Sequence, residues 1–164
     1  MAVHRLVVQK FGGTSVEDAR AMARVIEIVR TQGVKRRQRP LVVLSASAGV
    51  TDALLRVSEF ALRPRLNEAL LAIDQLEARH ARTTRELLKD AALTVKVQAA
   101  LHRNWEELRQ LARGIHLLRE LTPKSRDQIV SLGERCSTLI FHAGLSEALS
   151  ADGPAVHYLD AREF

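Results

Sequence analysis

The first third of the chain alternates between two hydrophobic patterns. Residues 3–9 are largely apolar and β-branched, which predicts a strand. Residues 16–31 carry apolar side chains at helical spacing, which predicts a helix with one face against a sheet. Residues 41–44 are continuously apolar after Pro40 and predict a second, fully buried strand. This order indicates a β–α–β unit with parallel strands, whose carboxyl ends lie at one edge of the sheet.

The middle of the chain is predicted to be helical. Residues 51–62 predict a helix with Thr51 as its N-cap residue. Residues 66–121 are almost free of glycine and predict a helical insertion made of two antiparallel helices. The turn between these helices is expected near residues 92–94, although residues 93–95 also suit a brief extended piece.

One more helix and one more strand are expected toward the end of the chain. Thr122 and Pro123 supply a cap and a first-turn proline for a helix through residues 129–140. Residues 155–159 predict a third core strand. Together these elements predict an α/β fold, with a mainly parallel sheet sandwiched by helices.

Composition narrows the class of protein. The chain has 164 residues, of which 46% are hydrophobic, enough for one domain. It has one cysteine, no recognisable secretory segment and no apolar stretch near the roughly 20 residues that cross a bilayer, so a soluble cytoplasmic protein is expected.

The six histidines lack metal-ligand spacing, so no metal site is predicted. Cys136 and His142 lie on different helix faces, which favours a core thiol over a catalytic pair.

The net charge of +6 raises the question of an anionic partner, either nucleic acid or a phosphorylated small molecule. The densest basic tract, residues 35–39, has no interleaved aromatic residue to stack on bases. We expect this tract to be a solvated connecting loop.

The segment from Lys10 to Val16 is the strongest candidate for chemistry. It places two glycines and two hydroxyls between a strand and a helix start, where backbone N–H groups can approach an anion. The candidate phosphate-binding residues are Lys10, Gly12, Gly13, Thr14 and Ser15. On spacing alone, a tight turn with an exposed lysine is an equally good interpretation.

Two later segments are candidate substrate sites. The loop of residues 45–51 consists of small residues, and its hydroxyls, Ser45 and Thr51 among them, could bind a carboxylate or could simply satisfy the loop backbone. Glu134 lies among apolar neighbours in a predicted helix, where an inward-pointing carboxylate would need a cation. The alternative for Glu134 is an ion pair with Arg135 or another arginine on an exposed face.

The heptapeptide Lys10-Phe11-Gly12-Gly13-Thr14-Ser15-Val16 resembles the N-terminal signature of aspartate kinases, which belong to the amino-acid kinase superfamily. Three further segments resemble elements of the same family in the same order: residues 42–51, 131–137 and 160–163. The resemblance implies the amino-acid kinase, or carbamate kinase-like, fold. It also implies transfer of a phosphoryl group from ATP to the side chain of L-aspartate, which yields 4-phospho-L-aspartate.

The resemblance assigns roles to these residues. Lys10 would neutralise the charge of the transferred phosphate, and Gly12, Gly13, Thr14 and Ser15 would line the phosphate path. Ser45 and Thr51 would orient the carboxylates of the substrate. Glu134 would hold its ammonium group. ATP with Mg²⁺ is implied for the complete enzyme, but no carboxylate in this chain is a convincing ligand for the metal.

Members of this family continue well beyond 164 residues. Residues 1–164 therefore resemble the N-terminal, substrate-binding portion of one amino-acid kinase domain, incomplete at its C-terminal side and without the nucleotide-binding half and regulatory domains. We expect this portion alone to be inactive, to bind no cofactor tightly, and to self-associate through an exposed sheet edge or helices. The alternatives are another phosphotransferase of the superfamily or a basic, non-enzymatic nucleic-acid-binding module.

Overall fold

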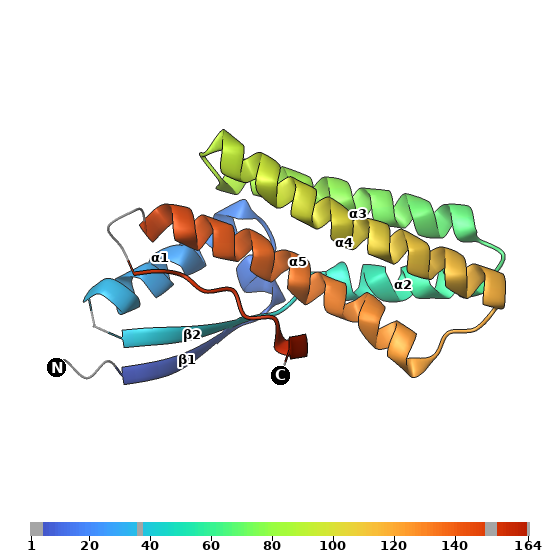
Figure 1. The fold of residues 1–164 in the computed structure, drawn as a ribbon, viewed down its shortest axis with the longest axis horizontal. Helices are drawn as coiled ribbons and strands as arrows, with labels where there is room; N and C mark the ends of the chain where they lie inside the picture. Colours follow the sequence, from blue (N-terminus) through green and yellow to red (C-terminus); the bar gives the residue numbers. More distant parts are fainter. Residues whose placement is uncertain (1–4, 36–37, 150–153, 164) are drawn as a thin grey trace.

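Helices dominate the computed structural model, which describes residues 5–35, 38–149 and 154–163. Its elements in chain order are β1 (Arg5–Phe11), the 3₁₀ turn η1 (Gly13–Val16), α1 (Ala19–Lys35), β2 (Gln38–Leu44), α2 (Val50–Leu62), α3 (Leu66–Leu87), α4 (Ala91–Leu118), α5 (Pro123–Leu149) and η2 (Ala161–Glu163). Helices α1 and α5 lie against the strands, and α2, α3 and α4 pack with α5 farther from them (Figure 1). None of the described helices combines the length and apolar character that a membrane span requires.

The two strands are parallel, as predicted, and α1 forms the crossover between them. The α/β prediction is therefore confirmed, although residues 3–4 of the predicted first strand lie outside the described residues. The prediction that the second strand is fully buried is wrong. Leu44 is buried, but Leu41 and Val43 are 39% and 44% exposed, as is Val8 of β1 at 63%. The reason is that the described helices pack only on the face that carries Leu44.

The first two helices begin at residues other than those predicted. Helix α1 begins at Ala19 rather than at Val16, because η1 intervenes and the Asp18 carboxylate accepts a hydrogen bond from Ala21 N at 2.7 Å. The N-cap of α2 is Gly49, with φ of 76°, and not Thr51, which lies in the first turn. A left-handed backbone at this position favours glycine over residues with a side chain.

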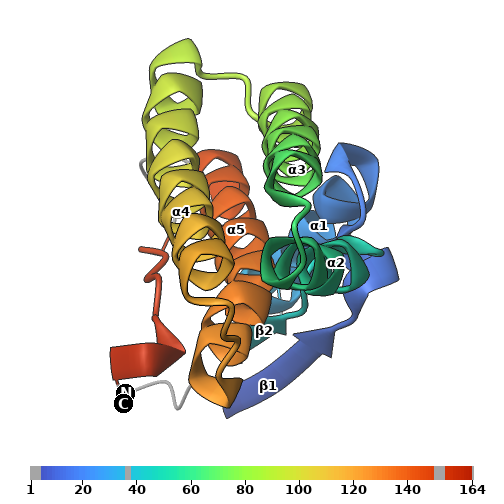
Figure 2. The same cartoon turned by 90° about the vertical axis from the view of Figure 1, so that its right-hand side faces the viewer.

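The two antiparallel helices predicted in the middle of the chain are α3 and α4. Figure 2 shows them side by side, next to α5. Their turn precedes residues 92–94, because Asp90 caps α4 by accepting hydrogen bonds from Ala92 N at 2.7 Å and Leu93 N at 3.1 Å. Residues 93–95 are helical, so the extended alternative is wrong. The predicted cap at Thr122 is confirmed, since its hydroxyl accepts from Ser125 N at 3.1 Å.

Two predicted irregular or extended segments differ from expectation. The expected loop at residues 35–39 is instead the end of α1 and the start of β2, and residues 36–37 lie outside the described residues. The third core strand predicted at residues 155–159 is absent from the structure as described. This segment has no regular secondary structure and makes no backbone ladder with β1 or β2. Val156 O lies 3.2 Å from His142 Nε2 of α5.

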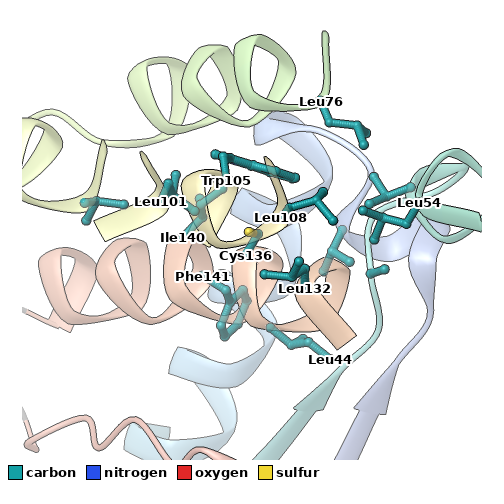
Figure 3. Packing of buried hydrophobic residues seen from close by; sticks show 14 of the residues in the cluster. Leu44, Leu54, Leu76, Leu101, Trp105, Leu108, Leu132, Cys136, Ile140 and Phe141 are labelled. Atoms are coloured by element: carbon teal, nitrogen blue, oxygen red, sulfur yellow. The ribbon is translucent and has the colours of Figure 1, made fainter. Parts of the chain in front are cut away.

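The core lies between α5 and the other helices, and Cys136 is part of it (Figure 3). Its thiol is fully buried, and burial raises the pKa of Cys136 to about 12. A thiol with so high a pKa is a poor nucleophile at neutral pH. The structure therefore agrees with the interpretation of Cys136 as a core residue.

Ion pairs and hydrogen bonds of charged side chains connect the helices of the insertion to one another and to α5. Arg109 of α4 bonds to Asp74 and Glu77 of α3, each at 2.6 Å, and to Glu106 at 2.8 Å. Glu147 of α5 accepts hydrogen bonds from the backbone of the α3–α4 turn, the shortest being Asp90 N at 2.7 Å. These contacts connect α3 to α4 and the α3–α4 turn to α5.

His80 of α3 is a buried titratable group in the core. Its ring lies 5.0 Å from that of Trp105, and its Nδ1–H donates to Leu76 O at 2.7 Å. Its Nε2 has no hydrogen-bond partner among the described residues. Burial lowers the pKa of His80 from 6.5 to about 4, because the protonated ring would be poorly solvated there.

We predict a pH-dependent stability that originates at His80. Between pH 6.5 and 4 the unfolded chain binds a proton at this ring and the folded chain does not, so the contribution is complete above pH 6.5 and is lost as the pH falls. The free energy of unfolding of the wild type, relative to His80→Gln, should fall by roughly 1 kcal/mol per pH unit in this window. Urea denaturation at several pH values measures it, with the exposed His157→Gln as control. Parallel pH profiles for the wild type and His80→Gln would contradict the prediction.

Candidate functional site

The loops that follow β1 and β2 lie side by side, as the parallel β–α–β unit predicts. Ser45 N donates to Phe11 O at 3.1 Å, and Ala48 N donates to Gly13 O, also at 3.1 Å. The hydroxyl of Ser47 donates to Val16 O at 2.7 Å. Residues 45–48 are therefore bonded to the end of β1 and to η1 along their length.

The two glycines of the first loop have different surroundings. A Cβ atom at Gly13 would lie 2.9 Å from Ala46 O and 3.3 Å from Ala48 N, so a side chain there would collide with backbone. A Cβ atom at Gly12 would meet nothing within 4 Å among the described residues. Gly13 therefore allows the two loops to approach, whereas Gly12 borders open space that a ligand could occupy.

Helix α5 brings the third candidate segment to the same place. A Cβ atom at Gly133 would lie 2.6 Å from Ala46 Cβ and 3.3 Å from Val50 Cγ1, so α5 crosses the loop at close range. The Ser137 hydroxyl donates to Ser45 O at 2.8 Å. Ala46 thus lies between Gly13 on one side and Gly133 on the other. We call this meeting of residues 12–15, 45–51 and 133–137 the Ala46 junction.

The predicted site residues are placed at or beside the Ala46 junction and are open to solvent to different degrees. Lys10 and Thr14 are exposed, and Gly12, Gly13, Ser15, Ser45, Thr51 and Glu134 are half-buried. Among the described residues, neither Lys10 nor Glu134 takes part in an ion pair. Both charges therefore remain available to a ligand.

The structure answers both sequence interpretations of Glu134. Glu134 is half-buried rather than enclosed, so it does not point into a sealed interior. The ion pair with Arg135 is not formed, because the Arg135 guanidinium donates to Glu107 Oε2 at 3.1 Å and to Asn104 Oδ1 at 2.8 Å. Arg135 holds α5 against α4 and leaves the neighbouring glutamate without a partner among the described residues.

Residues 160–163, the last segment that resembles aspartate kinases, follow the stretch of chain that contacts α5. The Asp160 carboxylate accepts hydrogen bonds from the Arg162 guanidinium, the shortest at 2.6 Å. These hydrogen bonds, and more weakly the charge of Arg135, lower the pKa of Asp160 to about 2. Asp160 is thus ionised at neutral pH and paired with Arg162.

Sequence reasoning did not single out Ala46 or Ser137 as residues that build the site, whereas the bond from the Ser47 hydroxyl to Val16 O fits the alternative that the loop hydroxyls satisfy backbone groups. One signal was available for Ser137, since Gly133 and Ser137 are four residues apart and share a helix face. The signal for Ala46 was only the small size of residues 45–48, which does not say what approaches them. Among the described residues, no cluster of three or more His, Cys, Asp or Glu side chains could hold a metal ion.

Comparison with known proteins shows which protein family this chain resembles. Residues 5–163 match the model of the amino acid kinase family. The chain is 36% identical over 141 residues to Aspartokinase 1, chloroplastic, of Arabidopsis thaliana, covering 85% of this chain and 23% of that protein. It is 35% identical over 136 residues to Lysine-sensitive aspartokinase 3 of Escherichia coli, covering 83% of this chain and 27% of that protein.

A solved structure shows the same fold. The crystal structure of E. coli aspartokinase III in complex with aspartate and ADP is similar with a TM-score of 0.74 and 34% sequence identity, covering 88% of this chain and 29% of that chain. The chain thus spans about a quarter of the length of the relatives it matches. Because the family match extends over almost the whole sequence and the fold agrees, this chain belongs to the amino acid kinase family.

Proposed function

We propose that this chain is the substrate-binding portion of an aspartate kinase, which transfers a phosphoryl group from ATP to the side-chain carboxylate of L-aspartate. The observation that carries the proposal is the Ala46 junction, where three segments far apart in the sequence meet. The relatives support it, since they are aspartokinases and one was solved with aspartate and ADP.

The proposed reaction suits the groups at the junction. The aspartate side chain has a pKa near 4, so it is an anionic nucleophile at neutral pH and needs no general base. The barrier is the repulsion between this anion and the γ-phosphate, which makes positioning and charge neutralisation the main tasks. Lys10 is exposed at the end of β1, where its ammonium can balance phosphate charge. The open space at Gly12 lets a phosphate approach the backbone there.

The remaining residues would hold the amino acid. Ser45 and Thr51 can donate hydroxyl hydrogen bonds to carboxylates, and Glu134 can pair with the ammonium group. Gly13, Thr14 and Ser15 would shape the phosphate path from η1. Magnesium would arrive with the nucleotide, and because the described residues contain no cluster that fits a metal ion, no step is assigned to it in this chain.

Binding of L-aspartate tests the proposal without requiring turnover. In a nuclear magnetic resonance titration, L-aspartate should shift backbone amides of residues 12–15, 45–51 and 133–137. Succinate, which has both carboxylates but no ammonium, should bind more weakly. Titration with L-glutamate tests whether the site prefers aspartate, so L-glutamate should bind more weakly than L-aspartate. Absence of shifts in these segments at tens of millimolar L-aspartate would overturn the proposal.

Glu134→Gln should weaken L-aspartate binding roughly tenfold, because a hydrogen bond between two charged groups contributes about 1.5 kcal/mol or more. Its succinate binding should be nearly unchanged, since succinate has no ammonium. Glu86→Gln, an exposed glutamate of α3, is the control. Equal loss of both ligands in Glu134→Gln would contradict the assigned role.

We further propose that this chain alone does not turn over, because it spans only about a quarter of the length of the aspartokinases that it matches. An ADP-release assay with L-aspartate should stay at background, and turnover above background would contradict the proposed inactivity.

The proposed compartment is the cytoplasm, although the Arabidopsis relative is named chloroplastic.

Self-association is expected at high concentration. Among the side chains whose burial is described, the sheet face opposite the helices exposes Val8, Leu41 and Val43, next to Lys10. Burying such a face is favourable by about 25 cal/mol for each Å² of apolar surface removed from water. Light scattering should show a mass above that of one chain, and Val8→Lys/Val43→Lys should reduce it. A monomer at high concentration would contradict this expectation.

A further inference from the structure

We infer that Ser47 and Ser137 are positioning residues of this site, whose buried hydroxyls hold the loop of residues 45–48 in the shape that presents Ser45 and η1 to substrate. The inference rests on the proposed function for the identity of the ligand. Both side chains are almost inaccessible to solvent, at 5% for Ser47 and 0% for Ser137, so neither can itself contact a substrate. Any effect of these two serines on substrate binding must therefore act through the groups to which their hydroxyls are hydrogen-bonded.

Ser137 acts on Ser45. Its hydroxyl, on α5, donates to Ser45 O at 2.8 Å across 92 positions of sequence, with Glu134 O at 3.1 Å as a second, local acceptor. The amide of Ser45 donates to Phe11 O at 3.1 Å. Ser45 is therefore held from both sides of its backbone, by β1 and by α5, and its own hydroxyl makes no hydrogen bond to a described residue.

Ser47 acts on η1. Its hydroxyl donates to Val16 O at 2.7 Å, and the amide of the next residue, Ala48, donates to Gly13 O at 3.1 Å. These two bonds attach the first and last residues of η1 to the second loop. Thr14 and Ser15 lie between the attached residues, so their orientation depends on this attachment.

These bonds differ from the ordinary local bonds of helical serines. Ser58 and Ser131 donate to carbonyls three residues earlier, Leu55 O at 2.6 Å and Gln128 O at 2.9 Å. Such local bonds are common and only satisfy the hydroxyl. The bonds of Ser47 and Ser137 instead join separate segments at the two places where substrate groups are expected. Loss of either hydroxyl leaves a carbonyl in the junction without its partner.

The test compares Ser137→Ala and Ser47→Ala with Ser58→Ala, which is equally buried, at 2%, but lies away from the junction. Ser137→Ala and Ser47→Ala should lower the denaturation midpoint more than Ser58→Ala, because the Ser58 hydroxyl makes only a local bond within its helix. Only the two junction variants should weaken L-aspartate binding, about tenfold, in the titration described above. Equal aspartate affinity in Ser137→Ala and Ser58→Ala would overturn the inference.

Hydrogen exchange provides a measurement that needs no ligand. Ser137→Ala should speed exchange of the Ser45 amide at least tenfold, and Ser47→Ala should do so for Ala48, while Ser58→Ala should change neither. If the wild type fails to bind aspartate, the proposed function fails, and the exchange rates still decide whether the hydroxyls hold the loop. Unchanged exchange in both junction variants would overturn the inference.

Discussion

Gly13→Ala is expected to destabilise the chain by about 3 kcal/mol and to abolish measurable aspartate binding. The new Cβ would lie 2.9 Å from Ala46 O and 3.3 Å from Ala48 N. Both neighbours are backbone atoms, so no side-chain rotation can relieve the contact, and the two loops must separate. Separation would also break the hydrogen bond from Ala48 N to Gly13 O. Denaturation followed by circular dichroism, together with the aspartate titration, measures both effects.

Gly12→Ala is the matched control for this prediction. Gly12 has φ of −80°, which alanine adopts readily, and a Cβ there meets no described atom within 4 Å. Its free energy of unfolding should stay within about 0.5 kcal/mol of the wild type. If Gly12→Ala and Gly13→Ala lose the same stability, the close approach of the two loops is not what requires glycine at position 13.

Gly133→Ala is expected to destabilise the chain by about 2 kcal/mol, although the same change in an open helix position is stabilising. Alanine in place of glycine inside a helix contributes up to about 1 kcal/mol of stability. Here that gain is outweighed, because the new Cβ would lie 2.6 Å from Ala46 Cβ and must push α5 away from the loop. Aspartate binding should weaken more than tenfold, since Glu134 moves with the helix.

Two further variants make this prediction specific. Ala46→Gly removes the atom that the new Cβ meets, so the double variant should be more stable than Gly133→Ala alone, with a coupling energy of about 1–3 kcal/mol in a double-mutant cycle. Gly114→Ala in α4 meets nothing within 4 Å and should be neutral or stabilising. A Gly133→Ala variant as stable as Gly114→Ala would show that α5 and the loop do not need this contact.

The order of elements could be predicted from the sequence because hydrophobic periodicity and capping residues are local signals. The β–α–β unit, the two antiparallel helices and the Thr122 cap are all written in short stretches of chain. The errors occurred where a local pattern has two outcomes. Residues 155–159 have the composition of a strand, but without a neighbouring strand beside them they lie along α5 as irregular chain. Leu41 and Val43 look like core residues, but the helices cover only the other face of β2.

The candidate site, like the fold, could be predicted from the sequence only in part. The resemblance to aspartate kinases singled out Lys10, Ser45, Thr51 and Glu134, and the parallel unit implied that the first two loops would be neighbours. The approach of α5 was not predictable in the same way, because Gly133 and Ala46 are 87 positions apart and their contact depends on how the helices pack. The roles of these site residues remain predictions that the proposed titrations address.

The sequence by itself determined most of the strands and helices, that the two strands run parallel, and which family the motifs resemble, because each of these depends on neighbouring residues or on a short motif. Only the tertiary structure decided that Ala46 lies between Gly13 and Gly133, that Ser47 and Ser137 bond across segments, and that Glu134 stays unpaired among the described residues. The physical reason is that such contacts depend on the packing of large surfaces far apart in the chain, and many sequences with the same local pattern could pack differently.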